Sequence, residues 1–140
     1  WRSGLDVTGG WGMAASDIDQ DGDNDITTNG GLFLNNRGDG SWVQVRAIGN
    51  VTSNWAALGA TIRIDAGGET YIRYVNGGTG QGCQDSLYVH AGLSDATTIE
   101  GIVVDFPAGE TVIYEGPFAV DQRIWLFEDG SYSTGWDWPE

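Results

Sequence analysis

Lysine is absent from the 140-residue chain, whose six basic residues are all arginine and are outnumbered by 20 acidic residues, for a formal net charge of -14. Nucleic-acid phosphates and anionic lipid headgroups are bound by clusters of basic side chains, which this composition does not supply. The absence of lysine also excludes Schiff-base chemistry and a P-loop phosphate site. Cations, neutral glycans and other proteins are the partners that the charge favours.

Other scarce residues limit the chemistry further. The chain has one cysteine, Cys83, and one histidine, His90, so an internal disulfide is excluded and few side chains could act as a general base near neutral pH. Cys83 is expected to be a small buried residue and His90 a strand residue with satisfied hydrogen bonds. No apolar run approaches the roughly 20 residues of a membrane span. We therefore expect no catalytic residue, no enzyme activity and no insertion into a membrane.

What the sequence does have is 23 glycines and a series of short segments in which apolar and polar residues alternate. Such alternation gives a β-strand one apolar and one polar face. It occurs at residues 42–48, 60–65, 71–75 and 86–90, and further apolar runs lie within residues 99–106, 110–114 and 122–127. Turns rich in glycine separate these runs, which predicts an all-β fold of the β-sandwich type. Trp42 and Trp125 lie inside strand patterns and are expected in the core.

The chain divides into three segments by composition. Residues 1–40 are rich in glycine and aspartate, residues 41–130 carry the strand patterns, and residues 131–140 form a tail that contains Trp136 and Trp138. The tail is expected to be too short and too polar to form another strand pair. Because the chain begins at Trp1 and not at methionine, we expect a mature product or a fragment whose targeting segment has been removed.

Aspartates occupy alternate positions in the segment from 17 to 25. They are Asp17, Asp19, Asp21, Asp23 and Asp25, and Gly22 stands where a sharp turn is needed. This spacing lets a loop wrap oxygen ligands around one hard cation, and Ca²⁺ accepts such a flexible shell. The loop is not an EF-hand, because position 12 is Thr28 where a bidentate glutamate would be required. The sequence predicts a calcium site, with an exposed acidic loop that holds no ion as the alternative.

Residues 10–40 resemble an FG-GAP/VCBS repeat. The segment 10–15, the aspartate loop, and the residues 32–36 and 38–40 follow the order of that family. One such repeat corresponds to a single propeller blade, which cannot cover its own faces. We therefore expect this segment to pack onto the sandwich or to dock against another chain.

The remainder of the chain resembles the ASPIC/UnbV domain, which follows such repeats in cartilage acidic protein and in bacterial secreted proteins. The resemblance rests on residues 53–54, 58–60, 67–68, 77–80, 90–93 and 106–109. Ala91, Ser94 and Phe106 depart from the residues usual in the family. Together, the two resemblances imply a calcium-stabilised β protein that is secreted and acts outside the cell or at its surface.

Tryptophans at the two ends of the chain are the candidate partner contacts. Trp1, Trp136 and Trp138 place large rings on short terminal segments, and aromatic residues are enriched where proteins meet their partners. We expect a non-catalytic module that makes protein contacts or assembles with identical copies as an adhesive, filament or matrix subunit. A carbohydrate-binding module is the alternative, and folding of the tail back over the sandwich as a lid is the competing role for its tryptophans.

Overall fold

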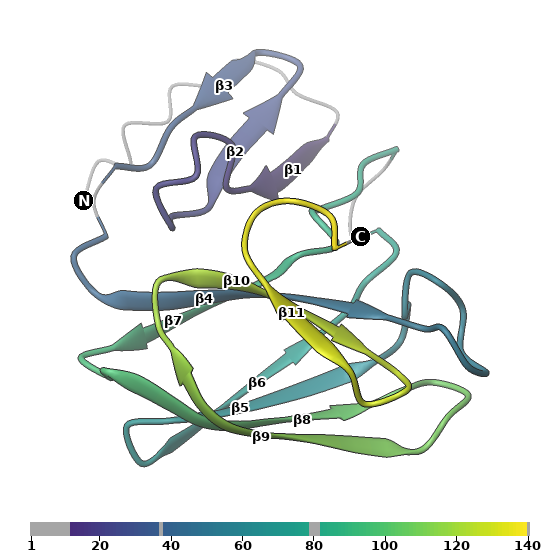
Figure 1. Cartoon of the computed structure of the whole chain (residues 1–140). Helices are drawn as coiled ribbons and strands as arrows, with labels where there is room; N and C mark the ends of the chain where they lie inside the picture. Colours follow the sequence, from purple (N-terminus) through teal and green to yellow (C-terminus); the bar gives the residue numbers. More distant parts are fainter. Residues whose placement is uncertain (1–11, 37, 79–81, 140) are drawn as a thin grey trace.

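The computed structural model describes residues 12–36, 38–78 and 82–139, and every regular element in this part of the chain is a β-strand (Figure 1). The strands are β1 (Met13–Ser16), β2 (Asp25–Thr28), β3 (Gly31–Phe33), β4 (Ser41–Ile48), β5 (Thr61–Ala66), β6 (Glu69–Tyr74), β7 (Val89–Ser94), β8 (Thr98–Asp105), β9 (Thr111–Ala119), β10 (Gln122–Phe127) and β11 (Tyr132–Thr134). In the described residues there is no helix that could cross a membrane.

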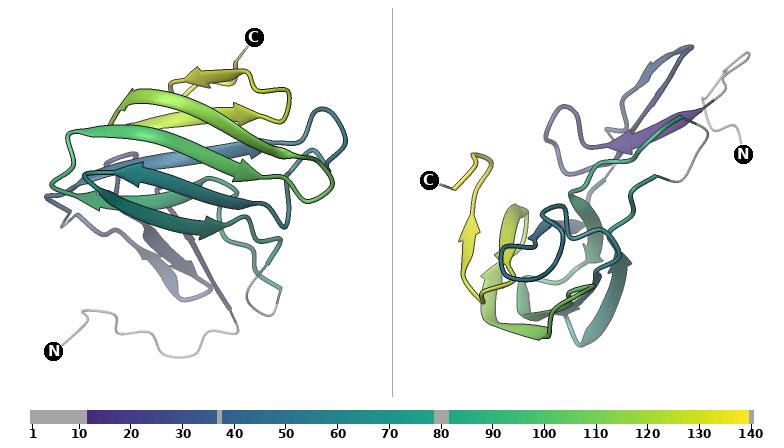
Figure 2. Two further views of the ribbon diagram at one scale, coloured as in Figure 1. Left: turned by 90° about the horizontal axis from the view of Figure 1, so that it is seen from below. Right: turned by 90° about the vertical axis from the view of Figure 1, so that its right-hand side faces the viewer.

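Two four-stranded sheets form a sandwich, as the sequence predicted. Their strand orders are β11-β10-β4-β7 and β6-β5-β8-β9, and β1, β2 and β3 make a separate small sheet. Strands β4 and β10 run parallel, while the other described neighbours are antiparallel. The small sheet lies outside the sandwich, beyond the face of the β11-β10-β4-β7 sheet (Figures 1 and 2).

The core lies between the two large sheets and follows from the alternation of residues along the strands. On β4 the inward residues include Val43 and Val45, and on β5 they are Ile62 and Ile64, all with no exposed surface. Fully burying a valine or isoleucine side chain contributes about 1.5 to 3 kcal/mol. These strands therefore supply much of the apolar burial that holds the sandwich together.

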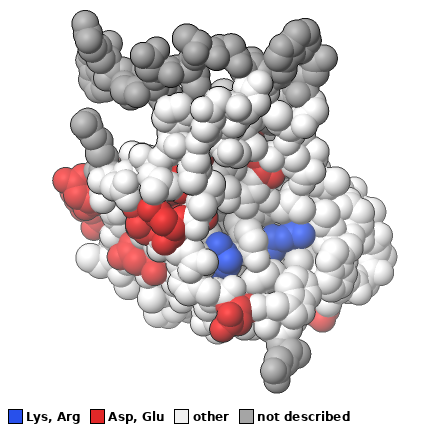
Figure 3. Space-filling model, turned by 90° about the horizontal axis from the view of Figure 1, so that it is seen from above, with Lys and Arg blue, Asp and Glu red and all other residues white. Residues whose placement is uncertain are grey.

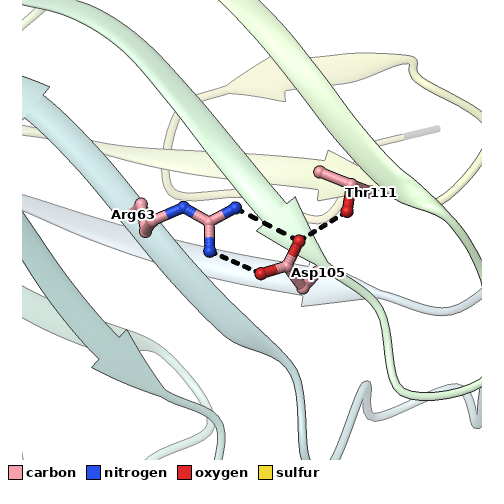
Figure 4. A network of polar contacts seen from close by, with 3 residues as sticks. All are labelled: Arg63, Asp105 and Thr111. Carbon is pink, nitrogen blue, oxygen red and sulfur yellow. Dashed lines mark hydrogen bonds and ion pairs between the residues drawn. The ribbon is translucent and has the colours of Figure 1, made fainter.

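The outward face of the β6-β5-β8-β9 sheet mixes polar residues with exposed apolar ones such as Ile72 and Ile113, and one polar network on it joins three adjacent strands (Figure 4). Arg63 on β5 donates two hydrogen bonds to Asp105 on β8, at 2.5 and 3.2 Å, and Thr111 on β9 donates another at 2.6 Å. The hydrogen bonds from Arg63 and then from Thr111 lower the pKa of Asp105. The network connects β5, β8 and β9 through side chains across the outer face of the sheet.

The outward face of the β11-β10-β4-β7 sheet is covered, which the sequence did not predict. Trp42, Gln44 and Arg46 alternate with the inward residues of β4, yet Gln44 is 2% and Arg46 7% exposed. Trp42 is half-buried and Trp125 is buried, but both lie on this outer face and not between the two sheets. The expected burial of Trp42 in the core was therefore wrong, whereas Trp125 is buried as expected but outside the cluster between the two sheets. The aspartate loop and the tail cover a face that alternation alone assigns to solvent.

The tail also differs from the prediction. Strand β11 pairs with β10, so the expectation that the tail is too short and polar for a strand pair was wrong. The ring of Tyr132 on β11 also meets Phe118 on β9, in the other sheet, edge to face at 5.2 Å. Farther along, Trp138 packs edge to face against Trp125 at 4.9 Å and Trp136 lies 6.0 Å from Trp42. Trp136 and Trp138 thus contact rings of their own chain, while Trp1 lies outside the described residues.

Candidate metal centre

The aspartate loop connects β1 to β2 and turns sharply at two positions. Gln20 and Gly22 have φ values of 64° and 95°. A Cβ atom added to Gly22 would lie 2.1 Å from the indole nitrogen of Trp42, so only glycine satisfies both the backbone conformation and the close packing. Gly22 therefore determines how the loop rests on the sandwich.

Three carboxylates come together in this loop. One oxygen each from Asp17, Asp19 and Asp21 lie within 4.8 Å of one another. Asp17 is 8% exposed, whereas Asp19 and Asp21 are exposed. Acidic side chains also gather to one side of the molecular face that carries the small sheet (Figure 3). The three oxygens form a cluster that opens to solvent through Asp19 and Asp21.

Asp17 is the most constrained member of the cluster. Its Oδ2 accepts hydrogen bonds from the backbone of Gly22 at 3.1 Å and from the side chain of Gln44 at 2.7 Å, while its Oδ1 is buried and has no hydrogen-bond partner. Burial raises the pKa of Asp17, and the charges of Asp21 and Asp25 act in the same direction, although backbone hydrogen bonds oppose them. A buried carboxylate oxygen without a partner is costly unless a cation or donor satisfies it.

The other two predicted ligands have different surroundings. Asp25 has no exposed surface, and its two oxygens accept hydrogen bonds from the backbone N–H groups of Ile18 at 2.7 Å and Asn35 at 2.8 Å. Asp23 accepts a hydrogen bond from the backbone of Gly38 at 2.6 Å. Neither belongs to the cluster of three, so in this structure Asp25 and Asp23 shape the loop and tie it to the segment after β3.

Asn36 is a further residue of the site that the spacing of aspartates did not reveal. Its amide nitrogen donates to Asp19 at 3.2 Å and to Asp21 at 3.1 Å, from 17 and 15 residues away. The only sequence signal for such a contact was the resemblance, which includes residues 32–36. The amide of Asn36 therefore presents its N–H₂ group to the cluster and holds two of its carboxylates, while the carboxylate oxygens are the ligands that a hard divalent cation prefers.

Among the described residues, His90 and Cys83 do not belong to the cluster of three carboxylates. His90 lies on β7 beside Gln44 of β4, and its Nε2 is buried without a hydrogen-bond partner, contrary to the expectation of a satisfied strand histidine. Burial is the main cause that lowers the pKa of His90, and the charges of Asp17 and Asp23 counteract it. Cys83 is a free thiol in the segment between β6 and β7 and is only half-buried, so the expectation that it is a buried residue was wrong.

The small sheet is joined to the sandwich near this site. Asp85, in the segment before β7, accepts a hydrogen bond from the backbone of Ala15 at 2.9 Å, and the backbone of Ser86 donates to the carbonyl of Ala15 at 3.0 Å. Strand β1 therefore contacts the segment before β7, while the loop that follows β1 contacts β4. The aspartate loop is positioned from both sides by the sandwich.

Comparison with known proteins identifies the larger part of the chain. The family model described as ASPIC and UnbV matches residues 49–133, which is more than half of the 140-residue chain and includes seven of its strands, β5 to β10 and most of β11. No curated protein matches the sequence. The match begins immediately after β4, so the strand that carries Gln44 and the aspartate loop precede it. By this match, the chain belongs to the ASPIC and UnbV family.

Proposed function

We propose that the protein is a non-catalytic, calcium-binding β module in which the ion stabilises the aspartate loop against the sandwich. The observation that carries the proposal is the cluster of Asp17, Asp19 and Asp21, with the buried Oδ1 of Asp17 lacking any hydrogen-bond partner. Bound there, a divalent cation would supply the missing electrostatic partner and offset the repulsion among three carboxylates.

Calcium fits this site better than magnesium does. Magnesium demands near-ideal octahedral geometry and retains several water molecules, whereas calcium accepts six to eight oxygen ligands in a flexible loop. The residues that would hold the ion are Asp17, Asp19 and Asp21, with the amide of Asn36 adjacent. The resemblance of residues 10–40 to FG-GAP/VCBS repeats supports the same choice of ion.

Calorimetric titration with calcium chloride tests the site. One ion is expected to bind the wild-type chain, and the double variant Asp19→Asn with Asp21→Asn is expected to lose binding, because two of the three clustered carboxylates become neutral. The double variant Asp95→Asn with Glu115→Gln is the control, since both residues are exposed on the sandwich and its charge change is the same. Equal affinity in the Asp19/Asp21 variant, or no binding by the wild-type chain, would refute the proposal.

The wider role that we propose is contact with a protein partner or with identical copies, in a secreted or cell-surface setting. Trp138 supports this role because its ring remains 52% exposed although it packs on Trp125. Trp55, which is 57% exposed, lies 5.6 Å from Trp138. Two adjacent indoles left open to solvent form an apolar patch of the kind that partners cover.

The same pair of rings favours a second function, carbohydrate binding, because exposed aromatic faces can stack on the apolar faces of sugar rings. Light scattering in calcium and in chelator separates the two functions. Assembly that increases with protein concentration, and that Trp138→Ala abolishes, supports contact between copies. A monomer that is retarded in a polysaccharide gel, with retardation lost in Trp55→Ala, supports the carbohydrate function instead. A monomer without retardation contradicts both self-assembly and binding to that polysaccharide.

A further inference from the structure

The amide of Gln44 connects the aspartate loop to the sandwich. Gln44 is 2% exposed, and its Nε2 donates to Oδ2 of Asp17 at 2.7 Å. This bond holds one oxygen of Asp17 and leaves Oδ1 as the atom available to a cation. If the amide were reversed, its oxygen would face the carboxylate and repel it, so the orientation of Gln44 matters for the geometry of the cluster.

Arg123 fixes that orientation. Its Nε and Nη2 both donate to Oε1 of Gln44, at 3.1 and 2.8 Å, from the adjacent position on the parallel strand β10. A guanidinium has only donors, so the amide atom that faces it must be the oxygen. The amide nitrogen of Gln44 is then directed to Asp17. Arg123 thus influences the position of Asp17 through Gln44, although Arg123 itself does not contact the aspartate cluster.

Two aromatic rings hold Arg123 in turn. The guanidinium carbon lies 3.7 Å from the centre of the Tyr88 ring and 4.3 Å from the centre of the Trp136 ring. Contacts of this kind attract the cation to the ring faces and restrict the plane of the guanidinium. Trp136 belongs to the tail, so the tail contributes directly to the position of Arg123.

A second path connects the tail to the aspartate loop through Trp42. The ring of Trp42 packs against Gly22 of the aspartate loop on one side and lies 6.0 Å from the ring of Trp136 on the other. The tail therefore contacts the loop's two supports, Arg123 and Trp42, through one residue. Trp138 packs on Trp125 and Trp55 instead, and it is linked to Arg123 only indirectly, because Trp125 packs edge to face against Tyr88 at 5.2 Å.

We infer that Gln44 and Arg123 are positioning residues for the Asp17 carboxylate, and that through them binding of calcium by the loop is coupled to docking of the tail at Trp136. The inference rests on the proposed calcium site. Coupling of this kind is reciprocal. If docking of the tail increases the affinity for calcium by some factor, bound calcium increases the equilibrium constant for tail docking by the same factor. The tail is then a regulator of the ion site as well as an edge of the sheet.

Calcium titration of tail variants tests the coupling. Trp136→Ala is expected to weaken calcium binding about tenfold, within the range usual for coupled sites. Trp136→Phe should recover most of the affinity, because a ring still covers the guanidinium. Arg123→Lys should also weaken binding, because an ammonium lacks the planar guanidinium that Tyr88 and Trp136 hold beside Gln44. In the wild-type chain, hydrogen exchange of amides 132–138 should slow when calcium is added.

Trp138→Ala is the matched control, since it removes a ring from the same tail without touching Arg123 or Trp42. Its calcium affinity should stay close to that of the wild-type chain and well above that of Trp136→Ala, because Trp138 reaches Arg123 only through Trp125 and Tyr88. This should hold even if its stability in chelator falls as much as that of Trp136→Ala. If the wild-type chain binds calcium and the two alanine variants bind it equally well, the coupling is refuted while the calcium site stands. If the wild-type chain does not bind calcium, both are refuted.

Discussion

Replacing Glu128 with glutamine is expected to lower the melting temperature more than neutralising any other single carboxylate of the sandwich. Glu128 is 7% exposed and follows β10. Its two oxygens accept hydrogen bonds from the backbone N–H groups of Val51, Thr52 and Ser53 and from the hydroxyls of Thr52 and Ser53, at 2.8 to 3.1 Å. A glutamine would present an N–H₂ group to some of these donors and leave them without an acceptor.

The dependence of the melting temperature on acid pH should also reveal the hydrogen bonds that Glu128 accepts. Burial alone would raise the pKa of Glu128, but the hydrogen bonds from Ser53, Val51 and Thr52 outweigh it and lower the pKa from 4.5 to about 2. Because the pKa is lower in the folded chain, the stabilisation is complete above pH 4.5 and is lost as the pH falls from 4.5 to about 2. Melting temperatures of the wild-type chain should fall across this window, and those of Glu128→Gln should fall less.

Glu110→Gln is the matched control for this experiment. Glu110 is an exposed carboxylate in the turn between β8 and β9 and lines the same cleft as Glu128, and the change removes the same charge. Its effect on the melting temperature should be small at every pH. A Glu128→Gln variant as stable as Glu110→Gln, with the acid dependence of the wild-type chain, would show that the Glu128 contacts do not stabilise the domain.

The sandwich could be predicted from the sequence because its strands carry their own signal. In β5 the apolar Ile62 and Ile64 flank Arg63, and the structure buries the first two and leaves the arginine on the outer face. Spacing likewise indicated the aspartate loop, since Asp17, Asp19 and Asp21 are separated by single residues and their oxygens do lie together. Local patterns determine both features.

Contacts between residues that are far apart in the sequence could not be predicted from such local patterns. Gln44 meets Arg123 across 79 positions, and Glu128 reaches the loop at residues 51–53 across 75 to 77. Nothing near Gln44 in the sequence distinguishes it from a solvent-exposed strand residue. Its burial depends on what covers the sheet, namely the aspartate loop and the tail. The same reason explains why Trp125 is buried although it lies on the outer face of its sheet.

Calcium at about 100 times its dissociation constant is expected to raise the free energy of unfolding by roughly 2.7 kcal/mol. The physical reason is that Asp17, Asp19 and Asp21 form a cluster only while the loop is folded, so the unfolded chain offers the ion no comparable site. Urea denaturation followed by tryptophan fluorescence, in calcium and in chelator, measures the difference. The Asp19→Asn and Asp21→Asn double variant should show the same unfolding midpoint under both conditions.

The extent of this stabilisation depends on whether the loop and the sandwich unfold together. Two contacts predict that they do: Gln44 of β4 donates to Asp17 at 2.7 Å, and the ring of Trp42 packs directly against Gly22. If calcium binds but the unfolding midpoint stays constant, the loop must open before the sandwich unfolds, and these contacts would not transmit the binding energy. A midpoint that rises with calcium, in a single transition, is expected because β4 belongs at once to the central part of the sandwich sheet and to the support of the loop.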